Sequence, residues 1–259
     1  MIRLGGHVQF VLISTSNGDD RAAVAPRFVL YRVDGKWHGR PAREITRNMR
    51  APHQTMVRDG IPYVVVPLVL AVMPVVLGYW LLAVPFVLIA AFMAYFFRDP
   101  NRSIPTEPGI VLAPADGLVT IVRLADGAEN PESLVSIFLS PLDVHINRSP
   151  ISGMITEIAY KRGKYLMATK AESRLLNEQN ALTIQGDGLT VRCTQIAGIL
   201  ARRIVCWKQK GERVKCGERF GMIKFSSRTD VLLPSCVDVM VHEGMRVRGG
   251  VTIVGRIKG

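Results

Sequence analysis

Two adjacent hydroxyl side chains stand out in the stretch "ERFGMIKFSSRTDVLLP", residues 218–234. Ser226 and Ser227 lie between a β-like run and a charged Arg-Thr-Asp segment. A solvated turn would account for this pair, and so would a serine that is chemically transformed. A serine hydroxyl becomes an effective nucleophile when a neighbouring base activates it. The rest of the chain must therefore supply that base if the pair is a reaction site.

Two histidines and one aspartate are the candidates for acid–base work in the C-terminal part of the chain. His145, in "FLSPLDVHINRSP", follows an apolar run and begins a polar turn, where site residues commonly lie. His242, in "VMVHEGMRVRGG", leads from a strand-like run into a turn. Asp116, in "APADGLV", is typical of a turn, although a carboxylate there could orient a histidine. An Asp, a His and a Ser spread this widely do not by themselves establish a catalytic triad.

Common catalytic and metal-binding motifs are missing from the sequence. It contains no G-x-S-x-G elbow, phosphate-binding loop, G-x-G-x-x-G or H-E-x-x-H motif. The cysteines form no C-x-x-C pair and have no histidine at ligand spacing, which argues against a zinc site. Free thiols in a reducing compartment are the simpler interpretation. The four cysteines are Cys193, Cys206, Cys216 and Cys236.

An uncharged run of 37 residues, 61–97, precedes these candidates. One membrane span needs about 20 apolar residues, so the run is too long for one span and short for two full spans. Gly78 near its middle and four distributed prolines predict a tight helical hairpin that spans twice or dips into one leaflet. Arg58 before the run, and Arg98 and Arg102 after it, predict that both ends lie on the cytoplasmic side. A buried helix pair in a soluble protein is the alternative.

From residue 103 onwards, apolar and polar residues alternate between Gly, Pro, Asn and Asp turns. This pattern, rich in Val and Ile, predicts many short strands. A helix is expected only at residues 168–182. We therefore expect a mainly β (α+β) protein with three parts: an N-terminal basic extension at 1–57, a membrane-associated hairpin at 58–102 and a β-rich catalytic domain at 103–259.

The net charge of +12 and pI near 10 indicate an anionic partner. Half of the excess charge lies in residues 1–58, which hold ten Lys/Arg and four Asp/Glu. No nucleic-acid motif accompanies it, so an anionic membrane is favoured over nucleic acid. Residues 1–57 are interpreted as a small β unit or a poorly ordered extension. A start at Met56 is an alternative.

Read together, several stretches in order resemble the short bacterial form of phosphatidylserine decarboxylase. They are "FFRDPNRSIP", "APADGLV", "FLSPLDVHINRSPISG", "GKYLMATKAESRLLNEQN", "QIAGILARRIVC", "GERFGMIKFSSRTDVLLP" and "EGMRVRGGVTIVG". The resemblance covers about residues 58–257 and includes the apolar hairpin. It implies a β-rich pyruvoyl decarboxylase domain whose C-terminal part is barrel-sandwich-like.

The resemblance implies a proenzyme that cleaves itself between Ser226 and Ser227, giving a β chain of 1–226 and an α chain of 227–259. Ser227 would become a covalent pyruvoyl group that takes up the electrons released when CO₂ leaves. By the same resemblance His145 is the base, Asp116 orients it, and Arg202 and Arg203 meet the substrate phosphate. The alternative is that one of the two arginines buries its stem and the other is a solvated guanidinium.

The implied activity is the conversion of phosphatidylserine, or a closely related serine phospholipid, to phosphatidylethanolamine at the cytoplasmic face of the plasma membrane. No metal is implied, and assembly into a homodimer is left open. The sequence departs from the family pattern at one position, because Ser226 stands where the family has glycine. That departure motivates an alternative, an unprocessed, non-catalytic β domain anchored to the membrane. A serine hydrolase would keep Ser227 in an uncut chain, and a lipoyl-type carrier lacks a modifiable lysine at a hairpin tip.

Overall fold

A computed structural model describes residues 2–3, 9–13, 28–33, 36–41, 56–126, 132–167, 172–186, 188–199, 203–225 and 227–258. The chain divides into two compact units, Met1–Gln54 and Thr55–Gly259. The first unit holds one antiparallel sheet in the order β1-β2-β3-β4. Its strands are β1 (Ile2–Arg3), β2 (Gln9–Ile13), β3 (Phe28–Val33) and β4 (Lys36–Pro41).

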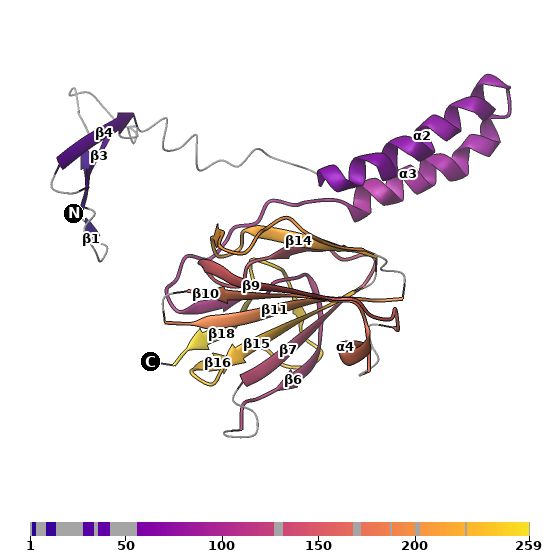
Figure 1. Cartoon of the computed structure of the whole chain (residues 1–259). Coiled ribbons are helices and arrows are strands. Elements are labelled where there is room, and N and C mark those ends of the chain that lie inside the picture. The colour runs from indigo at the N-terminus through magenta and orange to yellow at the C-terminus, as the bar shows by residue number, and fades with distance from the viewer. Residues whose placement is uncertain are drawn as a thin grey trace. The chain divides into compact units, whose positions relative to one another are not determined.

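The second unit opens with the helical hairpin, drawn in violet in Figure 1. A short 3-10 turn, η1 (Arg58–Gly60), leads into α2 (Ile61–Val76), and η2 (Trp80–Ala83) leads into α3 (Val84–Phe96). Gly78 makes the connection with a positive φ of 81°, a conformation that glycine adopts without strain. The sequence therefore correctly predicted a hairpin with Gly78 at its turn.

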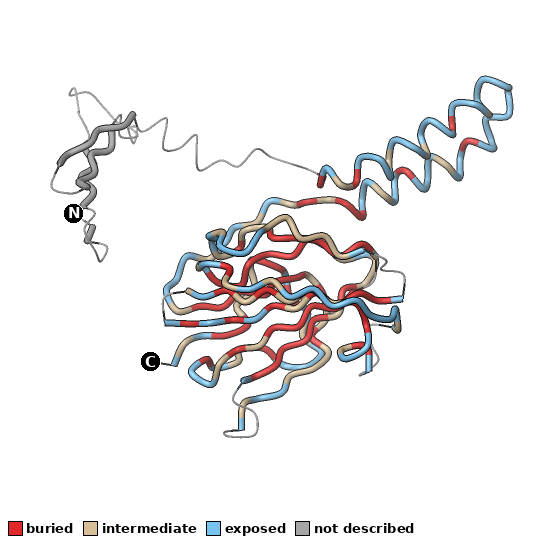
Figure 2. Tube along the Cα trace, viewed as in Figure 1, coloured by how far each residue is buried: buried red, intermediate tan, exposed pale blue. Residues whose placement is uncertain are grey.

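The hairpin differs from a soluble helix pair in what it buries. Ala71, Ala83 and Ala90 are buried, and small residues of this kind let two helices approach closely. Most of the large apolar side chains around them are exposed, as the pale blue of the two helices in Figure 2 shows. The segment Arg58–Val76 is long and apolar enough to cross a membrane, whereas Trp80–Phe96 is shorter.

The rest of the unit is almost entirely strand, which confirms the predicted mainly β class. Eight strands form a curled antiparallel sheet in the order β13-β9-β10-β11-β15-β7-β6-β17. They are β6 (Gly117–Arg123), β7 (Glu132–Leu139), β9 (Gly153–Lys161), β10 (Gln179–Gln185), β11 (Thr190–Ala197), β13 (Arg213–Val214), β15 (Ser227–Pro234) and β17 (Arg246–Val247).

Two three-stranded sheets complete the domain, in the orders β12-β14-β8 and β16-β18-β5. Alternate residues of the strands point inward, and the resulting core contains Val135, Ile155, Leu182 and Val231 among its fully buried side chains. The strands of the two small sheets are β5 (Ile110–Leu112), β8 (Ile146–Arg148), β12 (Arg203–Cys206), β14 (Arg219–Lys224), β16 (Val237–Val239) and β18 (Ile253–Ile257).

The helix expected at residues 168–182 is largely wrong. Residues 168–171 lie outside the described part, and only a single turn, α4 (Ser173–Leu176), is helical. Residues 179–185 form β10, which pairs with β9 on one side and β11 on the other. Asn180, Leu182 and Ile184 all point into the interior, so the tertiary environment of a central strand overrides a local helical preference.

Candidate functional site

Ser227 begins β15, in the middle of the large sheet. Its neighbours across the sheet are Leu139 of β7 and Ala197 of β11. The side chain is fully buried, and its Oγ has no hydrogen-bond partner among the described residues. Buried hydroxyls nearly always have a partner, so an unpartnered one indicates a site held ready for something other than folding.

Phe225 lies just before this serine, in an unusual backbone conformation. Its φ is 65°, and no other described residue except glycine has a positive φ. The left-handed region is costly for a bulky side chain and persists only where the surroundings impose it. Ser226 itself lies outside the described residues. Strained backbone therefore immediately precedes the predicted cleavage bond.

His145 lies in the turn between β7 and β8 and is fully buried. Its Nδ1 lies 2.9 Å from the carbonyl oxygen of Asp143, which can only accept, so Nδ1 carries the proton in the neutral ring. Nε2 is then the basic nitrogen, and it has no hydrogen-bond partner among the described residues. Burial lowers the pKa of His145 to about 4, so the ring is neutral at pH 7 and its Nε2 can accept a proton.

A buried hydrogen bond joins β8, the strand that follows His145, to β15, the strand that Ser227 begins. Asn147 Nδ2 donates to Thr229 Oγ1 over 3.1 Å. His145 lies two residues from Asn147, and Ser227 lies two residues from Thr229. Because side chains two apart on a strand share a face, this bond places the Ser227 side chain on the side of the large sheet that β8 covers.

The same network extends deeper into the domain. Gln195 donates to the Asn147 side-chain oxygen over 2.8 Å, and Asn180 donates to Gln195 over 3.0 Å. Gly221 on β14 makes room for it, because an added Cβ would lie 2.3 Å from the Val205 carbonyl oxygen and 3.1 Å from Gln195 Nε2. These amides are buried and paired, so they fix the layer without taking part in proton transfer.

Phe96, the last residue of α3, joins the hairpin to this site. Its ring lies 4.3 Å from the imidazole of His145 and 4.5 Å from the ring of Phe225, measured between centroids. The ring helps to exclude water from His145 and packs against the left-handed Phe225. The hairpin is therefore part of the site. The sequence analysis did not identify Phe96, because in the sequence it is only the end of an apolar run.

Asp116 makes its contacts elsewhere. One carboxylate oxygen accepts from the Gly249 amide over 2.8 Å, and the other lies 2.6 Å from an Arg102 guanidinium nitrogen. The charged groups that shift the pKa of His145 are Asp143 and Arg98. The structure thus pairs Asp116 with neither His145 nor Ser227. The orienting role expected for Asp116 stays a prediction, and the Asp143 carbonyl makes the contact that sets the tautomer.

The predicted phosphate-binding arginines are only partly described. Arg202 lies outside the described residues, and Arg203, the first residue of β12, is exposed. Its partner across the β12–β14 pair is Lys224, which is buried and lies three residues before Ser227. Sequence reasoning did not single out Lys224, although it lies inside the quoted stretch of residues 218–234.

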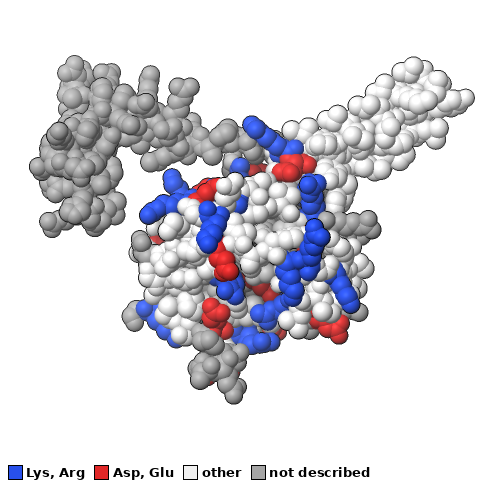
Figure 3. Space-filling view, in the orientation of Figure 1, with Lys and Arg blue, Asp and Glu red and all other residues white. Residues whose placement is uncertain are grey.

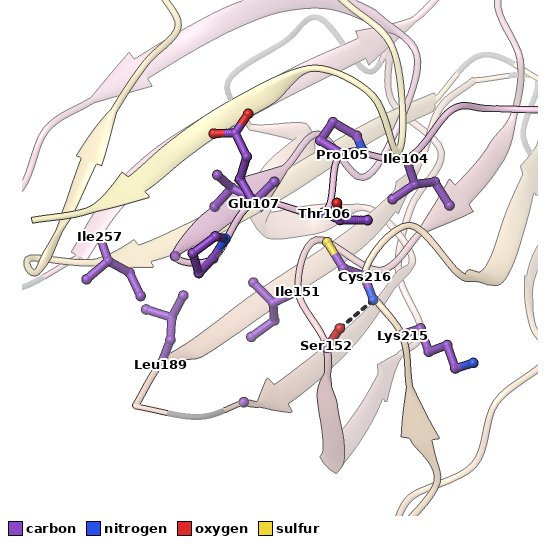
Figure 4. Close-up of a pocket in the computed structure, with 14 residues that line it drawn as sticks. Ile104, Pro105, Thr106, Glu107, Ile151, Ser152, Leu189, Lys215, Cys216 and Ile257 are labelled. Atoms are coloured by element: carbon purple, nitrogen blue, oxygen red, sulfur yellow. Dashed lines mark hydrogen bonds between the residues drawn. The ribbon is translucent and has the colours of Figure 1, made fainter. Parts of the chain in front are cut away.

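One cavity lies apart from these residues (Figure 4). It encloses about 720 Å³ between the segment 104–110 and the ends of neighbouring strands, and none of the predicted site residues lines it. Within it the Cys216 amide donates to Ser152 Oγ over 2.8 Å. Burial raises the pKa of the Cys216 thiol to about 11, so this cysteine is not a thiolate nucleophile at pH 7. Among the described residues no cluster of His, Cys, Asp or Glu could hold a metal ion.

Comparisons with known proteins point to one family. A family profile described as phosphatidylserine decarboxylase matches residues 89–255. The chain is 45% identical over 201 residues to the phosphatidylserine decarboxylase proenzyme of Solibacter usitatus, which covers 78% of this chain and 96% of that relative. It is 49% identical over 167 residues to the proenzyme of Pelodictyon phaeoclathratiforme, covering 64% and 79% of the two chains.

A third relative extends the match along the chain. The phosphatidylserine decarboxylase proenzyme of Burkholderia multivorans is 40% identical over 213 residues, which covers 81% of this chain and 100% of the relative. The alternative of a non-catalytic anchored domain finds no support in these similarities.

Proposed function

This chain belongs to the phosphatidylserine decarboxylase family and is a carboxy-lyase, and we propose that it cleaves itself at Ser226–Ser227 and then converts phosphatidylserine to phosphatidylethanolamine and CO₂. The observation that carries this proposal is the buried, unpartnered hydroxyl of Ser227 at the start of β15. Two residues before it lies the strained Phe225, whose ring stacks on Phe96, and Phe96 in turn contacts the neutral His145 with its unpartnered nitrogen.

The cleavage proceeds by an acyl shift. Ser227 Oγ attacks the carbonyl carbon of residue 226 while a base takes its proton, and an ester replaces the peptide bond. Loss of the Ser227 α-proton then expels the carboxylate of residue 226 and leaves dehydroalanine at residue 227. Hydrolysis of dehydroalanine releases ammonia and leaves a pyruvoyl group. His145 Nε2 is the base that the geometry offers for these proton transfers.

The fold accommodates a cut at this position. The new N-terminus at residue 227 would begin a strand that is hydrogen-bonded to β11 on one side and β7 on the other. The strands β17 and β18, which follow in the same fragment, pair with β6 and β5 of the larger chain. The 33 residues 227–259 therefore stay bound after cleavage, and the reactive group stays inside the sheet.

The pyruvoyl group derived from Ser227 supplies a carbonyl that takes up the electrons released as CO₂ leaves. Ser227 fits this role because its side chain is enclosed and its oxygen has no hydrogen-bond partner among the described residues. Once His145 has taken up a proton, its lowered pKa makes the protonated ring a strong donor, so the same ring suits proton transfer to the product carbon.

The hairpin supports a location of this site at a membrane. Its exposed side chains are apolar, and no Lys, Arg, Asp or Glu is drawn along its surface in Figure 3. Both ends of the hairpin lie on one side, where Arg58 is exposed. Arg102 is already paired with Asp116, so Arg58 and Arg98 are the flanking cations that favour the cytoplasmic side. We therefore place the enzyme on the cytoplasmic face of the cell membrane.

Intact mass spectrometry of the full chain and its Ser227→Ala variant tests the cleavage. We expect two chains from the natural sequence, 1–226 and 227–259, the smaller beginning with pyruvoyl, and one uncut chain from the variant. Release of CO₂ from phosphatidylserine in detergent micelles then tests the reaction. A natural-sequence chain that stays whole would contradict the proposal, and esterase activity in such a chain would indicate a serine hydrolase instead.

A further inference from the structure

Lys224 is a buried cation close to the cleavage position. It ends β14, is 7% exposed, and lies three residues before Ser227. A chain of three residues spans at most about 11 Å between Cα atoms, so a group bound by the Lys224 side chain remains within reach of residue 227. A lysine this deeply buried is rare unless its charge has a partner.

The ammonium group has few partners of its own. It lies 5.0 Å from the ring centre of Tyr63 and 6.0 Å from that of Phe97. Its ionic contact is with Asp59, at 3.9 Å, which is longer than a hydrogen bond. Asp59 in turn accepts a 3.1 Å hydrogen bond from the Trp207 ring nitrogen. An ammonium has three donors, and none makes a hydrogen bond within the described residues, so the group can bind a further anion.

The surroundings of Lys224 run from apolar to polar. Tyr63 also lines a cavity of about 360 Å³ made only of hairpin residues: Pro62, Tyr63, Val66, Pro67, Ile89 and Met93. Phe97 stacks on Tyr63, with centroids 5.2 Å apart, and packs against Phe96 over 5.0 Å, and Phe96 contacts His145. The rings next to Lys224 therefore connect the apolar surface of the hairpin to the candidate catalytic histidine.

A glycerophospholipid has the same order of chemistry, because its phosphodiester lies between the acylated glycerol and the head group. We propose that Lys224 binds the phosphodiester of the lipid substrate and so sets the head group at residue 227. This inference rests on the proposed function and identifies the residue that recognises the phosphate. Lysine binds phosphate as a point charge. The Asp59 carboxylate serves as its counter-ion when no lipid is bound.

Kinetics on soluble dihexanoyl phosphatidylserine test this role with Lys224→Met, Lys224→Arg and, as a control for charge alone, Lys210→Met in an exposed turn. We expect Lys224→Met to raise KM by about tenfold to a hundredfold, the effect of losing a charge-assisted hydrogen bond, with kcat and self-cleavage within about threefold of the natural enzyme. Lys224→Arg should keep most of the affinity, and Lys210→Met should leave KM unchanged. An unchanged KM in Lys224→Met overturns the proposal.

The variant Asp59→Asn distinguishes phosphate binding by Lys224 from a purely structural role, in which the Lys224–Asp59 ion pair holds the hairpin against the β domain. If the role is structural, Asp59→Asn and Lys224→Met each break this ion pair, so both should raise KM. If Lys224 binds phosphate, Asp59→Asn removes a competing and repelling carboxylate, and KM should fall or stay the same. A matching rise of KM in Asp59→Asn and Lys224→Met therefore contradicts the proposal.

Calorimetric binding of the same short-chain lipid to the uncut Ser227→Ala chain keeps this test independent of the chemistry. Adding Lys224→Met to that chain should weaken binding by about the same factor as the KM change. Equal binding with and without Lys224 overturns the inference, even if the enzyme proves active. Weakened binding supports it even if Lys224→Met prevents cleavage, while failure of the natural chain to cleave bears on the proposed function alone.

Discussion

Two buried polar regions of the β domain, both built from stretches that sequence reasoning quoted, differ in how their groups are satisfied. Around Ser227 and His145 the reactive atoms have no partners among the described residues, and aromatic rings pack against His145 and Phe225. Around Asp116 the charges pair: Arg102 with Asp116, and Asp99 with both Arg148, at 2.9 Å, and Arg219, at 2.7 Å.

This difference in pairing distinguishes groups that are available to react from groups that stabilise the fold. A paired buried charge is held in place and neutralised, whereas an unpaired base or hydroxyl has been buried at a cost and remains available to react. Arg102 Nε is the one atom of the ionic region that has no partner among the described residues. The ionic region ties the "FFRDPNR" segment, and with it the base of the hairpin, to β8 and β14. We therefore expect Asp116 to stabilise the frame and His145 to carry out proton transfer.

The largest effect is expected from His145→Gln. Glutamine can still donate to the Asp143 carbonyl but lacks a basic nitrogen, so self-cleavage should slow by about 10²- to 10⁴-fold. The appearance of chain 227–259 after synthesis, followed on gels, measures this rate. His242→Gln, at an exposed histidine, is the matched control and should cleave normally. Normal cleavage in His145→Gln would remove the histidine from the mechanism.

A stability effect of about 3 kcal/mol should accompany acidification. The pKa of His145 is about 4 in the folded chain and about 6.5 when unfolded, so between these values the unfolded state binds the proton. The free energy of unfolding should therefore fall as the pH drops from 6.5 towards 4. Thermal unfolding of the uncut Ser227→Ala chain in detergent, with and without His145→Gln, isolates this contribution. Identical pH dependence in the two proteins would refute the buried, neutral histidine.

Asp116→Asn should give the smallest effect on cleavage and a clear effect on stability. Asn keeps a carbonyl oxygen for the Gly249 amide but loses the ionic partner of Arg102, which should cost about 1–3 kcal/mol. Melting temperature and cleavage half-time measured on the same preparation distinguish the two regions. If instead Asp116→Asn cleaves as slowly as His145→Gln while melting normally, Asp116 belongs to the catalytic set and the separation drawn above is wrong.

Part of the fold could be predicted from the amino-acid sequence alone. The charge-free run 61–97 with a central glycine predicted the hairpin, because hydrophobicity and turn preference are local properties. Alternating apolar residues predicted the strands for the same reason, except at β10, where pairing on both sides decided the outcome. The choice of His145 and Ser227 as site residues stays a prediction; each lies next to a strand end in a recognisable stretch.

The sequence by itself thus determined the element types, the membrane-like character of the hairpin and the family to which the chain belongs. Only the tertiary structure decided which residues meet. Phe96 of the hairpin contacts His145, and Asp116 forms an ion pair with Arg102. Lys224 lies beside the rings of Tyr63 and Phe97. Local sequence patterns indicate burial and turns. Contacts between residues far apart in the sequence depend on how the sheets curl, and so does which buried polar groups are left without a partner.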